Sequence, residues 1–224
     1  MEKTILNFID SLIYHENEGE ACYSYFPNIP NRTLNASLFA VELLLSINVT
    51  DQNKEIAQKC INFVLNRQNE DGSFPYSESL KNGALKAQYD FHQYYVLGSL
   101  KRLSEKLDTH NYQEAILSGL AYSMKYQIED GMFFWRYPKK YPIDIHNQAA
   151  AVLTFRVFEN EINSFEGKRS TSLETIINWN ERNMWDGKKY YYQYYPYITI
   201  RTNYLRWNQG WMLAATSGNH SYSI

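Results

Sequence analysis

Two short motifs of the type Asp-x-His could supply acid–base chemistry: Asp90 with His92, and Asp144 with His146. Histidine changes its charge near neutral pH, and a nearby carboxylate helps it to act as a general acid or base. Each motif stands directly before an apolar stretch, so both pairs are expected at the start of a helix. Facing each other across neighbouring helices, they could remove a proton from one face of a sugar and deliver one to the other, as an epimerase or lyase requires. A pair of carboxylates could instead hydrolyse a glycosidic bond.

The same residues also have a purely structural interpretation. Aspartate is a common N-cap, because its side chain accepts a hydrogen bond from a free N–H group of the first helical turn. Asp90 and Asp144 would then be caps, and His92 and His146 would bond to the neighbouring hairpin. Two His and two Asp could in principle bind a metal, but no two of them form a close ligand pair on one helical face. We therefore expect no metal and no other cofactor.

Aromatic, amide and basic side chains around the same helix starts are typical of carbohydrate binding. Aromatic rings pack on the C–H faces of sugars, amides bond to hydroxyl pairs, and arginine holds a carboxylate or phosphate with two parallel hydrogen bonds. The pattern predicts a carbohydrate ligand that could contain a uronic acid. The predicted binding residues are Tyr25, Asn35, Tyr76, Gln93, Trp135, Arg136, Asn147, Gln148, Arg206, Trp207 and Gln209.

Tyrosine is unusually frequent in this chain. Aromatic residues make up 16% of the sequence, with 20 tyrosines, 11 phenylalanines and 5 tryptophans, and the tyrosines are dense at residues 190–197. Because tyrosine has an apolar face and a polar edge, the excess indicates either a partly hydrated cleft or many tyrosines at helix–helix contacts.

Glu42 stands inside an otherwise apolar helical stretch. A buried carboxylate is costly unless it is paired. We expect either a proton donor with a raised pKa or, more commonly, an ion pair with Arg32 or with a neighbouring helix.

The elements that must position these residues repeat along the chain. Three segments join a helical pattern to Asp-Gly and then to an aromatic segment: "CINFVLNRQNEDGSF" (60–74), "GLAYSMKYQIEDGMF" (119–133) and "IINWNERNMWDGKKY" (176–190). Glycine suits a left-handed turn after a helix, and Asp suits the position before it. With a weaker copy at Glu18-Gly19, the period is about 55 residues, as in helical repeat proteins.

An apolar helix with a polar start follows each turn, and Asn35, Gln93, Asn147 and Asn208 occupy the equivalent position in the four copies. Amphipathic helices lie between these apolar ones, which predicts outer and buried inner helices in alternation. We expect one domain over residues 1–224, with hairpins at about 1–47, 51–106, 111–160 and 170–217. The predicted fold is all-α, an incomplete α/α toroid related to (α/α)6 barrels, whose polar inner-helix starts gather at one mouth.

The segment "FVLNRQNEDGSF" resembles the QW-type repeat of squalene cyclases and prenyltransferases, with Gln68, Asp71, Gly72 and Phe74 in matching places. The resemblance implies a toroid and says little about chemistry. The aspartate motifs DxDD and DDxxD of terpenoid cyclases and diphosphate-binding enzymes are absent, so a terpenoid cyclase or prenyltransferase-like protein is only the third functional hypothesis.

A longer succession, from "NASLFAVELL" through "DFHQYYVLGSL" and "YPIDIHNQAAAVLTF" to "NYLRWNQGWML", is similar to the C-terminal part of prokaryotic α/α-toroid proteins encoded with exopolysaccharide biosynthesis genes. Members of that family usually have about six hairpins, and this chain would begin at the third. The resemblance implies an open arc, a fragment, or one half of a split protein. It places the chain in polysaccharide biosynthesis or modification.

Composition excludes several classes. A net charge of −2 and a pI near 6.2 argue against nucleic-acid binding, and no 18-residue apolar run predicts a membrane span. Residues 1–20 are acidic and amphipathic, and they are expected to be a helix of the mature protein and not a signal peptide. With only Cys22 and Cys60 as cysteines, a reducing, cytoplasmic location is expected.

Our first hypothesis is a polysaccharide-modifying protein with acid–base chemistry of the epimerase, lyase or glycosidase type. The alternative is a non-catalytic module that binds a carbohydrate or an assembly partner, where a second polypeptide or self-association completes the toroid. The two differ in whether Asp90, His92, Asp144 and His146 lie within proton-transfer reach around a cleft.

Overall fold

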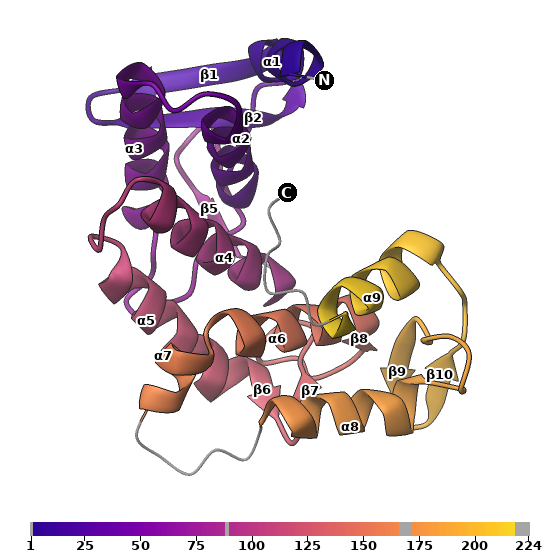
Figure 1. Ribbon diagram of the computed structural model, residues 1–224. Helices are drawn as coiled ribbons and strands as arrows, with labels where there is room; N and C mark the ends of the chain where they lie inside the picture. Colours follow the sequence, from indigo (N-terminus) through magenta and orange to yellow (C-terminus); the bar gives the residue numbers. More distant parts are fainter. Residues whose placement is uncertain (1, 88–89, 166–171, 218–224) are drawn as a thin grey trace. The chain divides into compact units, whose positions relative to one another are not determined.

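The computed structural model describes residues 2–87, 90–165 and 172–217, apart from the side chains of Asp90 and Gln127 (Figure 1). Its residues group into two compact units. Of the described residues, the first contains 2–87 and 95–119, and the second contains 90–94, 120–165 and 172–217.

The chain is mainly helical, as expected, but the prediction of an all-α protein is incomplete. About 54% of the described residues are helical and 18% are in strands. Described residues form four small antiparallel sheets of two or three strands each. Their aromatic and β-branched residues favour extended backbone, and pairing across a tight turn satisfies the backbone groups between two helices.

The first unit contains the helices and strands from α1 to β5 and most of the next two helices. Its elements are α1 (Glu2–Ser11), β1 (Leu12–Asn17), β2 (Glu20–Pro27), β3 (Arg32–Thr33), α2 (Leu34–Ile47), α3 (Asp51–Leu65), β4 (Ser77–Glu78) and β5 (Leu85–Lys86), with most of α4 (Asp90–Lys106) and α5 (Gln113–Tyr122). The helix predicted over residues 1–20 ends at Ser11. The rest forms a hairpin with β2, because Tyr14, His15 and Glu16 pair with Tyr23, Cys22 and Ala21.

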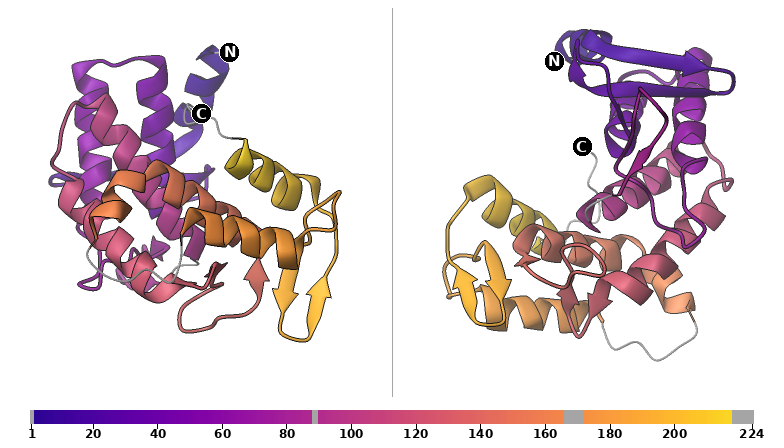
Figure 2. Two further views of the ribbon diagram at one scale, coloured as in Figure 1. Left: turned by 60° about the horizontal axis from the view of Figure 1, so that its bottom comes forward. Right: turned by 180° about the vertical axis from the view of Figure 1, so that it is seen from behind.

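Burial separates an inner from an outer helix in this unit. Ten of the 14 residues of α2 are buried, whereas α3 buries mainly one side, through residues such as Ala57, Ile61 and Val64. The two helices pack side by side (Figure 2). This is the arrangement that their apolar patterns predict.

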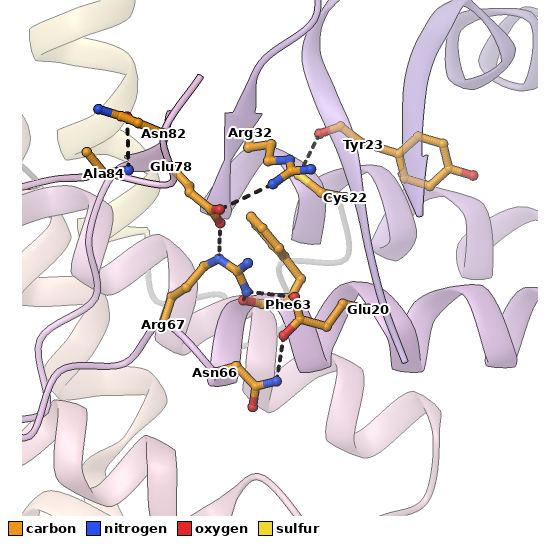
Figure 3. Close-up of polar contacts among 10 residues, drawn as sticks. All are labelled: Glu20, Cys22, Tyr23, Arg32, Phe63, Asn66, Arg67, Glu78, Asn82 and Ala84. Atoms are coloured by element: carbon orange, nitrogen blue, oxygen red, sulfur yellow. Dashed lines mark hydrogen bonds and ion pairs between the residues drawn. The ribbon is translucent and has the colours of Figure 1, made fainter. Parts of the chain in front are cut away.

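Charged side chains tie the strands of the first unit to α3 (Figure 3). Arg67 at the end of α3 donates to Glu20 at 2.9 Å and also contacts Glu78, which in turn pairs with Arg32 at 3.2 Å. Glu42 is held separately, because Arg102 of α4 donates to both of its carboxylate oxygens, at 2.7 and 3.1 Å. The ion pair with a neighbouring helix is therefore observed for Glu42, and Arg32 has another partner.

The second unit is organised around α6 (Ile145–Val157). Eleven of its 13 residues are buried, and it packs against both α8 and α9 (Figures 1 and 2). The other elements are η1 (Ser123–Gln127), β6 (Ile128–Glu129), β7 (Met132–Phe133), β8 (Ile143–Asp144), α7 (Glu159–Ser164), α8 (Leu173–Met184), β9 (Gln193–Tyr195), β10 (Ile198–Ile200), η2 (Leu205–Gly210) and α9 (Trp211–Thr216). Strand β8 pairs with β9, so the residue that precedes α6 is fixed by a strand nearly 50 positions later.

The Asp-Gly turns pack closely against the next outer helix. Gly72 has φ +88°, and an added Cβ would lie 2.2 Å from the carbonyl oxygen of Ser118 in α5. Gly131 has φ +85°, with the carbonyl oxygen of Thr175 in α8 at 2.7 Å from the same position. Both glycines are therefore required by conformation and by space. Gly187, with φ +88°, has no described atom within 4 Å of that position.

Candidate functional site

Asp144 anchors three elements of the second unit. It caps α6, accepting the N–H of His146 on Oδ1 at 2.9 Å. Oδ1 also accepts the indole N–H of Trp207 at 2.9 Å, and Oδ2 accepts Nε2 of Gln193 at 2.9 Å. The side chain is fully buried, and this burial raises the pKa of Asp144 although the three hydrogen bonds oppose the shift. The cap interpretation of Asp144 is confirmed.

The imidazole of His146 lies between two aromatic rings. It is stacked on Phe91, with ring centroids 4.7 Å apart, and on Trp211, with centroids 4.4 Å apart. The edge of Trp207 meets it at 4.3 Å. Burial, together with the charge of His92, lowers the pKa of His146 to about 3, so the ring is neutral at physiological pH. The neutral imidazole is 3% exposed and stacked against two rings, so it belongs to a buried aromatic cluster.

His92 is the more accessible of the two histidines. It is half-buried in the first turn of α4, and its charge acts on His146, which places the two rings near each other. Asp90 begins α4, but its side chain lies outside the described residues. The structure thus brings His92 and His146 together. Asp144, in contrast, accepts hydrogen bonds from three donors of the protein. It is buried, and both of its carboxylate oxygens already accept hydrogen bonds from the protein, which favours the structural role.

Two predicted binding residues hold backbone instead. Gln148 accepts the N–H of Phe133 and donates to the carbonyl of Gly131 at 2.9 Å. Gln209 accepts the N–H of Tyr190 at 3.0 Å and donates to its carbonyl at 2.8 Å. Both amides fasten the segment after an Asp-Gly turn to the next inner helix. This role takes the place of the predicted ligand binding, because the amide groups are used internally.

The four aligned amides share this internal character. Asn147 donates to the carbonyl of Phe134 at 3.0 Å, and Asn208 donates to that of Thr202 at 2.8 Å. Both side chains are fully buried, as is Gln93, and Asn35 is 7% exposed. In the two inner helices that begin near Asn147 and Asn208, the polar start therefore ties the helix to the segment before it.

The remaining predicted residues are divided between the units. Tyr25, Asn35 and Tyr76 belong to the first unit, where Tyr25 is 46% exposed beside Phe26. Trp135 and Arg136 belong to the second and are half-buried. Trp135 lies 6.4 Å from the ring of Phe91 and so extends the aromatic cluster around His146.

A pocket of about 530 Å³ opens beside Trp207 in the second unit. Trp207 is half-buried, so one residue both bonds to Asp144 and lines the pocket. The rings of Tyr192 and Tyr204 meet edge to face at 5.1 Å. The lining residues are Tyr192, Asn203, Tyr204, Leu205, Arg206 and Trp207.

No protein-family model matches the sequence, and no curated protein matches it significantly. Solved structures that are similar to this chain include two carbohydrate-processing enzymes. One is the cellobiose 2-epimerase from Bacillus thermoamylovorans B4167, with a TM-score of 0.60 and 13% identity, over 80% of this chain and 51% of that chain. The other is described as a novel alpha-amylase from Clostridium perfringens, with a TM-score of 0.59 and 12% identity, over 91% of this chain and 60% of that chain.

The likeness is one of fold. It supports the predicted α/α-toroid class, and the chain spans between half and three-fifths of the length of these two structures. The QW-type repeat and the link to exopolysaccharide genes stay predictions from the sequence.

The sequence pointed to Arg206 and Trp207 but missed Asn203, Tyr204 and Leu205. Nothing in the stretch "NYL" (203–205) predicts a pocket, because these residues line one only once η2 packs beside α6. Among the described residues, no three His, Cys, Asp or Glu side chains are grouped so as to hold a metal. Within the same residues, no helix is both long and apolar enough to cross a membrane.

Proposed function

We propose that this protein binds a carbohydrate in the pocket beside Trp207. The observation that carries the proposal is the double role of Trp207, which lines the pocket while its N–H is fixed by the buried carboxylate of Asp144. A ring held in this way offers a flat apolar face at little cost in conformational entropy. Tyr192 and Tyr204 add aromatic surface, and Asn203 adds an amide that can meet a hydroxyl group.

The comparisons agree with this proposal at a coarse level. Both similar structures are named as enzymes that process carbohydrates, a cellobiose epimerase and an alpha-amylase, which supports a carbohydrate-modifying role in general. The narrower role that we propose, in polysaccharide biosynthesis or modification, rests on the family resemblance of the sequence.

Catalysis is the second candidate function. It is favoured by one observation, that half-buried His92 lies close enough to the neutral His146 for its charge to lower that pKa. The more accessible His92 could exchange a proton with a bound sugar, as epimerase or lyase chemistry requires, while His146 stays neutral beside it. Solvent deuterium incorporation into sugars that the protein binds would test it: loss of exchange in His92→Ala is expected, and no exchange in the wild type contradicts this candidate.

Titration calorimetry with neutral and acidic oligosaccharides tests the binding proposal. Tyr204 is 48% exposed and lines the pocket, so Tyr204→Ala is expected to weaken binding about tenfold, the usual cost of one aromatic contact. Tyr197 is 99% exposed and is not a lining residue, so Tyr197→Ala is the matched control and should bind as the wild type does. Equal affinities of the two variants would refute the site, and binding of no sugar would refute the function.

We also propose that a partner completes the toroid. The turns at Gly72 and Gly131 each pack on an outer helix, while the position beside Gly187 is open among the described residues. We propose that an outer helix of a second polypeptide or of a second copy covers it. Light scattering over a range of protein concentrations would detect self-association, and a monomer at all concentrations would leave only a different polypeptide.

A further inference from the structure

We infer that the pocket beside Trp207 takes a saccharide that carries an acidic group, and that Arg206 recognises this group. The inference rests on the proposed function and names its class of ligand. It starts from the charge of the pocket. Among the six described lining residues, Arg206 is the one cation, and none is Asp or Glu.

Arg206 differs from the arginines of the first unit. Each of those arginines pairs with a glutamate: Arg32 with Glu78, Arg67 with Glu20, and Arg102 with Glu42. Arg206 is exposed, and within the described part of the chain it has neither a carboxylate nor an aromatic ring as partner. A guanidinium that no internal group neutralises can donate two parallel hydrogen bonds to a carboxylate, sulfate or phosphate.

Within the described residues, the buried carboxylate of Asp144 forms no ion pair with Arg206. Asp144 is fully buried, is not a lining residue, and accepts three hydrogen bonds, one of them from the indole edge of Trp207. The smaller pocket of the second unit, of about 240 Å³ beside α7, is the opposite case, because its described lining includes Glu159 and Glu174 and no cation. Of these two pockets, only the one at Trp207 suits an anionic ligand.

Neighbouring groups fit the remainder of a sugar. Gln209 donates to Oδ1 of Asn203 at 3.0 Å, which orients the Asn203 amide and leaves its NH2 group as a donor for a hydroxyl oxygen. The rings of Tyr204 and Trp207 flank Arg206 in sequence and line the same pocket. Aromatic faces for the sugar ring and one arginine for its acidic substituent together describe an acidic saccharide.

Arg206→Gln tests the inference, with Arg201→Gln as its matched control. Arg201 lies five residues earlier, and its guanidinium is placed over the ring of Tyr191 at 5.0 Å, outside the pocket lining. The probes are acidic and neutral oligosaccharides paired by length and linkage: galacturonate with galactose, glucuronate with glucose, and mannuronate with mannose. Sulfated oligosaccharides and inorganic phosphate alone show whether the acidic group must be a carboxylate.

The wild type is expected to bind at least one acidic member about tenfold or more tightly than its neutral partner, the usual range for a hydrogen-bonded charged pair. Arg206→Gln should lose this preference while neutral binding changes less than twofold, and Arg201→Gln should keep it. The preference should also shrink at 0.5 M salt, because exposed charges are screened.

Two outcomes would overturn the inference, and they are distinguishable. If neutral and acidic partners bind equally, or if Arg206→Gln keeps the preference, the anionic ligand is wrong while carbohydrate binding stands. If no oligosaccharide binds to the folded protein, the proposed function fails, and the inference fails with it.

Discussion

The indole N–H of Trp207 donates to Oδ1 of Asp144 at 2.9 Å, across 63 positions of the chain. Trp207 belongs to η2, and Asp144 caps α6, so this bond fixes the wall of the pocket to the most buried helix of the unit. It also explains why Asp144, which looks catalytic in the sequence, is engaged as a structural group.

Asp144→Asn and Asp144→Ala should therefore behave differently. Asparagine keeps an Oδ1 for Trp207 and for the N–H of His146, and Gln193 can rotate its amide to accept from the new NH2 group. We expect Asp144→Asn to cost about 1 kcal/mol of unfolding free energy or less, and Asp144→Ala about 3 kcal/mol, because alanine leaves buried donors unpaired.

Urea unfolding followed by tryptophan fluorescence measures both variants, and sugar binding supplies a second readout. If the role of Asp144 is structural, the Asp144→Asn protein should still bind the sugar. Loss of turnover in a fully stable Asp144→Asn protein would instead return this residue to the catalytic role.

The three Asp-Gly turns form a matched series. In the chain without a partner, alanine at Gly187 adds only the cost of a left-handed backbone, about 1 kcal/mol, because no described atom lies within 4 Å of its Cβ. Alanine at Gly72 or Gly131 must also displace a helix carbonyl oxygen at 2.2 or 2.7 Å, and we expect a loss of about 3 kcal/mol or more. Chemical unfolding of the three variants checks the order, and equal losses would show that the turns do not pack as described.

His146 should make stability depend on pH. Its pKa is about 3 in the folded protein and 6.5 in an ordinary environment, mainly because burial disfavours the charged ring. Between these values the unfolded chain binds a proton that the folded chain does not. Stability is therefore complete above pH 6.5 and falls as the pH falls, by at most about 1.4 kcal/mol per pH unit.

His146→Phe keeps a ring between Phe91 and Trp211 but removes the titration. The difference in slope between wild type and variant from pH 6 to pH 4 isolates His146. Asp144 has a raised pKa, which acts in the opposite direction, but it is present in both proteins and cancels. Parallel pH profiles would contradict a buried, neutral His146.

Arg67 should be the critical cation of the first unit. Its partners Glu20 and Glu78 are 17% and 10% exposed, so Arg67→Met leaves the poorly hydrated Glu20 without its cation and Glu78 with Arg32 alone. We expect a loss of about 3 kcal/mol. Lys54→Met is the control, since Lys54 faces an exposed Asp51 at 4.0 Å and should change stability by less than about 0.5 kcal/mol. Similar losses in urea unfolding would mean that the Arg67 cluster is only a surface feature.

Parts of the fold could be predicted because they depend on local properties. The uniformly apolar α2 and α6, the one-sided α3, and the glycines with positive φ at the turns follow from hydrophobic period and from glycine conformation. The strands could not be predicted in the same way. Residues 12–17 continue a helical pattern, and only their pairing with residues 20–27 favours the extended form.

The sequence by itself determined the helical repeats, the polar start of each inner helix, and the aromatic and basic residues near Trp207. Only the tertiary structure decided what the polar residues do. An Asp-x-His motif reads the same whether its carboxylate is free or accepts bonds from Gln193 and Trp207, 49 and 63 positions later. Burial and hydrogen-bond partners depend on which distant segments pack together, and they decide whether a side chain anchors the fold or meets a ligand.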